Sequence, residues 1–375
     1  MKLPRTDRTF FILAAILCLS LSLRVYAAAT MGIARGDEYG TAASAQSLAE
    51  RGEFTGWTMR SYFYPALLAV FGKTCLLFGE PSFLRMIPIY SIHGYWIFIN
   101  RVFNVLLGII GIYLTYKLGE TCYGEKVGLL AAFLQGINCL DVFWGMRSVP
   151  DPSSTPFLVT SLLFLMKIND DRNRYLPLLS GISLGISVMC RYSSALYVIP
   201  VIILFLVRRE LRNEFWLFGV GFAVMMISQG MLDLLTWGRL FGSSIEFFAF
   251  NILEEKALIW GYKPFQYYYV MLPIIFAHTY PLPLLALERI DWKTCFLTSS
   301  VGLFLWVMSS LPHKELRFLL TIIPLMCILS SQGILARSRS RRERMLLFLL
   351  VGLTIIWQAK RFAFFFLEDP SQIFV

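Results

Sequence analysis

The sequence predicts an all-α polytopic membrane protein with a bundle of about eleven transmembrane helices. Hydrophobic residues make up 57% of the chain and charged residues only 15%, whereas soluble domains carry about 25% charged residues. The apolar residues form long blocks, such as 10–23 and 346–356, and not the stripes of a half-buried surface. Such blocks are typical of helices that cross a bilayer, which need about 20 residues each.

Basic clusters between these blocks set the expected orientation. Positive residues gather in five connections, at 117–126, 167–174, 208–212, 289–293 and 337–344. Cytoplasmic loops carry an excess of Lys and Arg, so we expect these connections and the N-terminus on the cytoplasmic side. The resulting spans lie near residues 10–30, 95–117, 127–146, 154–167, 176–191, 193–207, 215–236, 267–287, 293–310, 316–335 and 345–366.

A long outer loop is expected after the first span. Segment 64–78 is apolar, but counting it as a crossing would place the basic cluster 337–344 outside. We therefore interpret it as juxtamembrane or re-entrant backbone, which protein or a water-filled cavity can cover. The first outer loop then covers 31–94 and a second one 237–264, within a single domain of residues 1–375. Long loops of this kind tend to have functional roles.

Charge and cysteine usage narrow the function further. The net charge is +10, but the basic residues lie in short clusters between apolar blocks, so nucleic acid is not an expected partner. The seven cysteines include no CxxC pair. Neither a zinc site nor a disulfide framework is therefore indicated.

Polar residues gather on the expected outer side of the membrane. They are Asp37, Glu38, Arg60, Arg147, Asp151, Arg191, His313, Lys314, Glu315 and Arg317. Ionisable groups at a membrane boundary are costly to place unless they are paired or functional. Carboxylates beside several cations suit the transfer of a group from an anionic lipid phosphate to a hydroxyl.

Such a transfer requires a general base and fixed positive charge for the departing phosphate. We predict Asp37 as the base. Arg317 offers a planar fork for phosphate oxygens, while Lys314 adds a point charge and His313 a donor or acid. Glu315 would orient these cations, and the chemistry does not require a divalent metal. If the segment is helical, His313 and Arg317 share one face.

Structural roles compete with functional ones at several positions. Arg147, Asp151 and Arg191 could simply pair or snorkel at helix ends, but Asp37 and Glu38 have no long stem with which to snorkel. The GxxxG pattern from Gly181 to Gly185 indicates helix packing and not a ligand site.

The segment His313-Lys314-Glu315-Leu316-Arg317-Phe318 resembles the H-K-E-x-R-F motif of glycosyltransferase family 22, whose mannosyltransferases use a dolichol-phosphate-mannose donor. Further similar blocks occur in the family's order. They are Asp37-Glu38, the stretch from Arg60 through Tyr62 and Tyr64 to Pro65, Arg147 with Pro150 and Ser153, Asp233 through Gly238, Phe250-Asn251 and Gly261 to Tyr268.

This resemblance implies the GT-C architecture, a polyprenyl-phosphate sugar donor, an inverting mechanism and an active site on the non-cytoplasmic face. It implies that Asp37 is the catalytic base, with Glu38 beside it. The His313 motif is then expected near the donor phosphate. Arg147 and Arg191 are expected on the donor side too. Loop support or acceptor binding is expected of Arg60, Tyr62, Tyr64, Asp151 and Asp233.

The predicted function is transfer of a hexose, with mannose favoured, to a hydroxyl of a glycan or glycolipid. A lipid-linked-sugar transporter or flippase is an alternative, as is a GT-C transferase acting on protein or lipid A. The chain is shorter than eukaryotic members of the family and shows no retention signal at Val375. These departures favour a bacterial or archaeal plasma membrane over the endoplasmic reticulum. The acceptor and the oligomeric state stay open.

Overall fold

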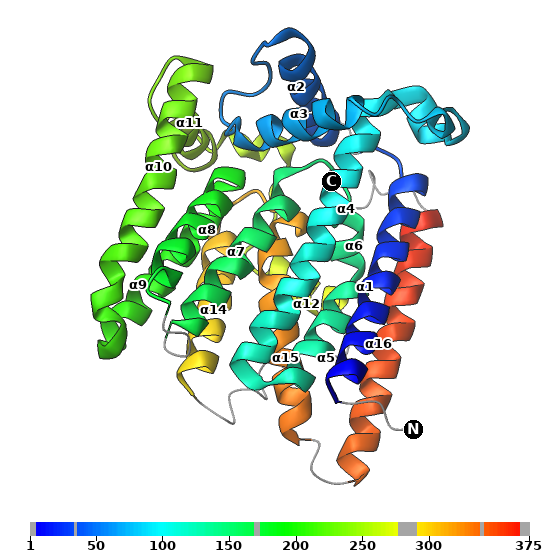
Figure 1. Ribbon diagram of the computed structural model, residues 1–375, viewed down its shortest axis with the longest axis vertical. Coiled ribbons are helices and arrows are strands. Elements are labelled where there is room, and N and C mark those ends of the chain that lie inside the picture. The colour runs from blue at the N-terminus through cyan, green and yellow to red at the C-terminus, as the bar shows by residue number, and fades with distance from the viewer. Residues whose placement is uncertain (1–4, 34–35, 169–172, 277–290, 338–340, 368–375) are drawn as a thin grey trace.

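The computed structural model describes residues 5–33, 36–168, 173–276, 291–337 and 341–367, and every regular element in them is a helix. Figure 1 shows long helices side by side in a bundle, with shorter helices across its upper end. The predicted all-α fold class is confirmed within these residues. The second half of the predicted span 267–287 lies outside them, as do Arg172 and Arg289.

Four helical segments are long and apolar enough to cross a membrane, namely Arg8–Thr30, Gly94–Tyr123, Arg209–Trp237 and Leu316–Arg337. A fifth crossing results if α5 (Glu125–Gly136) and α6 (Cys139–Gly145) form one span, bent by 63°. Helices occupy the other predicted spans too, but their described parts are shorter or less apolar. The predicted count of about eleven crossings therefore stays a prediction.

The bundle consists of these long segments and of further helices that lie alongside them. Its members are α1 (Arg5–Thr30), α4 (Pro88–Tyr123), α5, α6, α7 (Pro150–Lys167), α8 (Leu176–Cys190), η2 (Tyr192–Tyr197), α9 (Val198–Val207), η3 (Arg209–Glu214), α10 (Phe215–Trp237), α12 (Tyr267–Phe276), α14 (Trp292–Ser310), η7 (Leu316–Ile322), α15 (Ile323–Arg337) and α16 (Arg341–Leu367). In Figure 1 the ends of α4, α9 and α15 and the start of α16 lie at the lower end. The predicted basic connections next to these ends thus share one side of the bundle.

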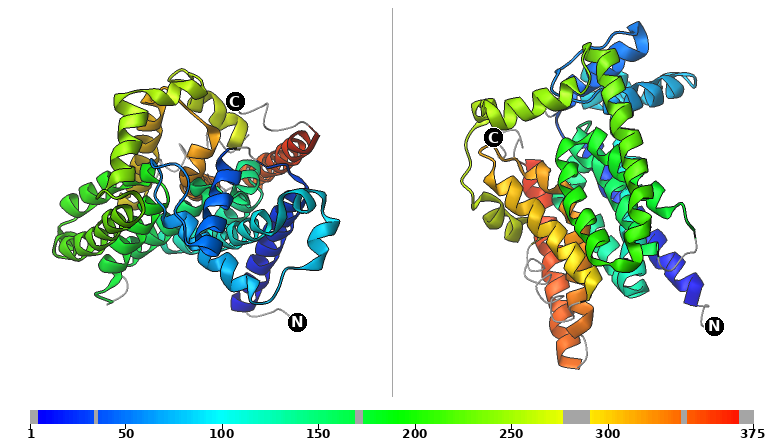
Figure 2. Two further views of the ribbon diagram at one scale, coloured as in Figure 1. Left: turned by 90° about the horizontal axis from the view of Figure 1, so that it is seen from above. Right: turned by 90° about the vertical axis from the view of Figure 1, so that its left-hand side faces the viewer.

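The segment predicted as the first outer loop, residues 31–94, is largely helical. It contains α2 (Asp37–Arg51), α3 (Phe63–Leu76) and η1 (Ser82–Met86), after which α4 begins and bends at Gly94. Figures 1 and 2 show α2 and α3 lying at the upper end of the bundle and not among the long helices. The second outer loop adds α11 (Gly242–Phe248), η4 (Ala249–Leu253) and η5 (Lys256–Trp260) at the same end.

Glycines bring α8 and α10 into close contact. A Cβ at Gly181 would lie 2.1 Å from the carbonyl oxygen of Phe218, and one at Gly221 would lie 2.2 Å from that of Leu178. Small residues allow two helix backbones to approach in this way. The packing role predicted for the Gly181–Gly185 pattern is confirmed.

Local sequence explains where the segments near the site begin. Val149 is extended and Pro150 opens α7, a position where a missing N–H is no loss. The side chain of Asn138 accepts a hydrogen bond from the backbone of Asp141 and caps α6. Glu315 is extended, and η7 starts directly after it. The breaks before α7 and η7 lie next to Asp151 and Arg317, whereas the break at Asn138 separates α6 from α5 within one possible span.

Candidate active site

Asp37 lies between two arginines from distant parts of the chain. It opens α2, where a carboxylate in the first turn interacts favourably with the helix dipole. One carboxylate oxygen is 2.6 Å from an Nη atom of Arg60, and the other forms an ion pair with Arg317. Burial alone would raise the pKa of Asp37, but Arg317 and Arg60 together hold it well below its usual range. Asp37 is therefore ionised near neutral pH.

Arg317 is fixed in place by acidic groups on three sides. Its Nη2 atom donates a hydrogen bond of 2.7 Å to one carboxylate oxygen of Glu315, and its Nε atom lies 2.7 Å from the other oxygen as an ion pair. Asp151 lies 4.0 Å from Nε, and Asp37 pairs with Nη1. The ring of Trp144 adds a cation–π contact at 5.3 Å. Arg317 thus joins the first outer loop, α6 and α7 at one point.

Arg191 reaches the same group of charges from the end of α8. Its Nε atom is 3.0 Å from Asp151, and its guanidinium lies 4.5 Å from the centre of the Phe318 ring. Among the described residues, no acceptor meets the two terminal nitrogens of Arg191. This edge of the guanidinium is available for a further anion.

His313 and Lys314 have different roles from one another. The two ring nitrogens of His313 lie 3.2 Å from the carbonyl oxygen of Gly261 and 3.1 Å from Glu315. Lys314 donates to the carbonyl oxygen of Lys263 at 2.9 Å and to that of Leu311. Burial lowers the pKa of Lys314. Lys314 thus fastens the motif to the second outer loop.

The motif is not helical throughout. Residues 313–315 precede η7, so the condition under which His313 and Arg317 would share a helix face is not met. The two side chains still converge, because each contacts Glu315. Burial would raise the pKa of Glu315, but Arg317 and His313 outweigh it and lower the pKa.

Glu38 is fully buried and held by two arginines. Arg101 of α4 contacts its carboxylate at 2.7 and 3.2 Å, and Arg147 contacts it at 3.2 Å. Arg101 also donates to the carbonyl oxygens of Ala28 and Met31. Arg101 therefore ties the start of α2 to the end of α1, and no accessible surface of Glu38 is left for a substrate.

Three other predicted residues lie in networks that hold the outer loops. The Tyr62 hydroxyl donates to the carbonyl oxygen of Ser44 at 2.9 Å, and the Tyr64 hydroxyl donates to Asn104 at 3.0 Å. Asp233 accepts from the backbone and the hydroxyl of Ser243 at the start of α11. In the described part of the chain, no group of three His, Cys, Asp or Glu residues is arranged to hold a metal ion.

Sequence reasoning missed the charged residues inside apolar blocks. Arg24 of α1 is fully buried and lies 2.7 Å from the carboxylate of Asp141 on α6. Arg101 sits within the apolar segment that starts at Gly94. An isolated arginine inside a predicted span is itself a signal, since an intramembrane charge needs a partner.

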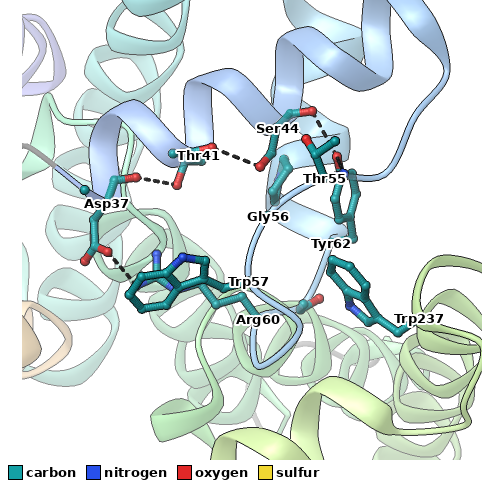
Figure 3. Close-up of a pocket in the computed structure, with 13 residues that line it drawn as sticks. Asp37, Thr41, Ser44, Thr55, Gly56, Trp57, Arg60, Tyr62 and Trp237 are labelled. Carbon is teal, nitrogen blue, oxygen red and sulfur yellow. Dashed lines mark hydrogen bonds and ion pairs between the residues drawn. The ribbon is translucent and has the colours of Figure 1, made fainter.

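A pocket opens beside Asp37, and no residue of the His313 motif lines it. It encloses about 420 Å³ of empty space, part of it open to solvent, and lies between α2, the segment 55–62 and Trp237. Figure 3 shows Asp37 at one end of this pocket and Tyr62 with Trp237 at the other. The arrangement joins a carboxylate, fixed cations and a pocket at one end of a helical bundle.

Comparison with known proteins adds the family context. A model of the Alg9-like mannosyltransferase family matches residues 13–368. The chain is 23% identical over 278 residues to a Dol-P-Man:Man(7)GlcNAc(2)-PP-Dol alpha-1,6-mannosyltransferase of Arabidopsis thaliana, covering 73% of the chain and 53% of the relative. It is 23% identical over 292 residues to GPI mannosyltransferase 3 of Yarrowia lipolytica, covering 76% and 54%. The chain thus spans about half the length of these curated relatives.

A solved structure supports the fold. The crystal structure of ArnT from Cupriavidus metallidurans bound to undecaprenyl phosphate matches with a TM-score of 0.70 at 14% identity, covering 94% of this chain and 64% of that one. At that identity the likeness shows the GT-C fold and nothing finer. Both curated relatives described above come from eukaryotes, so they give no support to the expected bacterial or archaeal membrane.

Proposed function

Because the chain belongs to the Alg9-like mannosyltransferase family, we propose that it transfers a mannosyl residue from a polyprenyl-phosphate donor to a hydroxyl of a glycan or glycolipid. The relatives named for such an activity use Dol-P-Man, which makes dolichol-phosphate mannose the donor to test first. The observation that supports the proposal most strongly is the pairing of an ionised Asp37 with Arg317. A base and phosphate-binding cations are the two groups that the chemistry requires.

The proposed reaction is a single inverting displacement. The acceptor hydroxyl gives its proton to Asp37 while its oxygen forms a bond to the anomeric carbon. The bond between that carbon and the phosphate oxygen breaks, and its electron pair stays on the phosphate. The phosphate then gains a second negative charge, which nearby guanidinium groups stabilise. The step forms no covalent intermediate with the protein.

Arg191 and Arg317 are the cations that we assign to the donor phosphate. Arg191 presents an edge without an acceptor among the described residues, and Arg317 lies between Asp37 and Asp151. Lys314 was expected to share this role, but its ammonium group bonds to backbone carbonyls. We therefore assign Lys314 to holding the motif in place.

Glu38 is assigned a supporting role for a similar reason. Its carboxylate neutralises Arg101 and Arg147 in a fully buried position, where an unpaired charge would cost several kcal/mol. This pairing fixes the start of α2 and thereby the position of Asp37. Arg147 contacts Glu38 and the ring of Phe143 and is itself buried.

We propose that the chain is a multi-pass membrane protein and that its site lies on the non-cytoplasmic face. All the site residues come from the upper end of the bundle, whereas the ends next to the basic connections lie at the lower end (Figure 1). Basic connections favour the cytoplasm. An endoplasmic reticulum membrane fits the eukaryotic relatives.

The purified protein in lipid nanodiscs tests the proposal. We expect transfer from polyprenyl-phosphate mannose to a lipid-linked glycan and none from GDP-mannose. The product should have the anomeric configuration opposite to that of the donor, as measured by NMR. Transfer from the nucleotide sugar alone would exclude the proposed donor, and retained configuration would exclude the single displacement.

A further inference from the structure

The pocket beside Asp37 has a lining that suits a sugar ring. One wall is a face of α2 made of Asp37, Gly40, Thr41 and Ser44. Apart from the carboxylate of Asp37, these residues are small or hydroxyl-bearing, and their spacing places all four on one side of a helix. Aromatic side chains form the other walls. They are Trp57, Tyr62 and Trp237. A pyranose ring has apolar C–H faces and a polar edge, which such a mixed lining can match.

Hydrogen-bonding capacity is left over on the α2 wall. Thr41 donates to the carbonyl oxygen of Asp37 at 2.8 Å, and Ser44 donates to that of Gly40 at 2.9 Å. Each hydroxyl oxygen can therefore still accept a hydrogen bond from a sugar hydroxyl. Figure 3 shows both side chains along the same stretch of α2 as Asp37.

Glycines determine how much room the pocket has. A Cβ at Gly40 would meet no atom within 4 Å, so the absence of a side chain there leaves the pocket open and is not required by packing. Gly56 closes the far wall. Its φ of +123° favours glycine, and a Cβ there would lie 2.7 Å from the hydroxyl of Ser44. The segment 55–62 can therefore approach α2 closely at one end while the other stays open.

The pocket is lined by Asp37, the proposed base, but not by the proposed donor cations Arg191 and Arg317. Arg60 lines the pocket and contacts one oxygen of the Asp37 carboxylate. Arg317 contacts the other oxygen and is not among the residues of the pocket wall. An inverting displacement needs the acceptor oxygen near the base and opposite the leaving phosphate. The pocket beside Asp37 is therefore a position that the acceptor could occupy.

We infer that this pocket binds the terminal hexose ring of the glycan acceptor and presents one of its hydroxyl groups to Asp37. The inference rests on the proposed transfer reaction and assigns its acceptor subsite. The occupant is a monosaccharide ring at the end of a glycan, and the rest of the glycan extends through the open side of the pocket.

Filling the pocket from Gly40 tests the inference. Gly40 lines the pocket, the Cβ of the new side chain in Gly40→Leu meets no protein atom within 4 Å, and a helix interior favours leucine over glycine. We expect the acceptor KM to rise by about tenfold or more, since single methylene groups in a pocket already change specificity by factors of about 10–200. The donor KM and the melting temperature should stay close to those of the wild type. Gly40→Ala should give a smaller rise.

Gly302→Leu is the matched control. Gly302 lies in α14, and a Cβ there also meets nothing within 4 Å, but it does not line the pocket. An unchanged acceptor KM in folded Gly40→Leu would overturn the inference. A rise in the donor KM alone would also overturn it, because the pocket would then hold the donor sugar. Failure of the proposed reaction is distinguishable from both results, because the wild type would then transfer nothing from polyprenyl-phosphate mannose.

Discussion

Asp37 and Arg317 form an ion pair that joins the first residue of α2 to the start of η7, two positions far apart in the chain. Neither residue has only this partner. Arg60 contacts the second oxygen of Asp37, and Glu315 holds Arg317 through two nitrogens. The first outer loop and the His313–Phe318 motif are therefore one structural unit, and the predictions below follow from its charges.

Asp37→Asn should abolish proton transfer while keeping the size of the side chain. A positioned general base contributes about 10²–10⁴-fold to a rate, and we expect a loss of kcat in that range. The donor KM should change little, because Arg191 and Arg317 remain. The measurement is steady-state transfer with purified protein, with the melting temperature as the test of folding. A variant with normal kcat would remove Asp37 from the role of base.

The state of Asp37 also predicts a pH profile. A depressed pKa keeps the carboxylate ionised, so its contribution to stability is present above the unfolded pKa near 3.8 and is lost as the pH falls through the lower folded value. Protonation of Asp37 should therefore cause no acidic limb in kcat/KM between about pH 5 and 7. Arg60→Gln removes one of the two cations that lower this pKa and should shift the acidic limb upward. An identical profile in wild type and Arg60→Gln would contradict this account.

Replacing Arg191 should raise the KM for the donor more than the KM for the acceptor. In Arg191→Ala the free guanidinium edge is lost, and we expect the donor KM to rise by about tenfold or more, as hydrogen bonds to charged groups are worth about 1.5–3 kcal/mol. Arg191→Lys should recover part of the loss, since it keeps the charge but not the planar fork. The matched control is Arg51→Ala at the same end of the molecule, where Arg51 forms an exposed pair with Glu53. Equal effects of Arg191→Ala and Arg51→Ala would show that Arg191 has no special relation to the donor.

The residues of the site could be predicted from the sequence, whereas their partners could not. Asp37, Arg60, Glu315 and Arg317 do lie together. Family motifs mark such positions because the residue types recur in order. The pairings depend on three-dimensional approach between distant segments, and so Lys314 was expected at the donor phosphate although its ammonium group reaches backbone carbonyls instead.

The fold too could be predicted only in part, because the positions of helices could be predicted but the breaks within them could not. Apolar blocks predicted where helices occur, since bilayer crossing requires length and hydropathy that composition reveals directly. The breaks within blocks were harder to foresee. The predicted span 127–146 contains the turn between α5 and α6, where Asn138 caps the second helix. A local side-chain hydrogen bond ends one helix and starts the next, and hydropathy averaged over a window does not detect it.

The buried pair of Arg24 and Asp141 gives a prediction about stability. Arg24 contacts the carboxylate at 2.7 Å and a backbone carbonyl of the same residue at 2.9 Å, and Gln135 also donates to that carboxylate. The pair thereby joins α1 to α6 inside the bundle. Since α6 also contains Trp144, whose ring lies 5.3 Å from the guanidinium of Arg317, the pair also positions one wall of the site.

Replacing one member of this pair should cost more than replacing both. Arg24→Met leaves the Asp141 carboxylate buried without its cation, for which we expect a loss of about 3–5 kcal/mol in the free energy of unfolding. In the double variant Arg24→Met with Asp141→Leu, no unpaired charge remains, and most of that loss should be recovered. Denaturant unfolding in detergent measures both variants, and a double-mutant cycle gives the coupling between the residues. If the double variant is as unstable as Arg24→Met, packing around the long arginine stem and not the ion pair determines the stability of this part of the bundle.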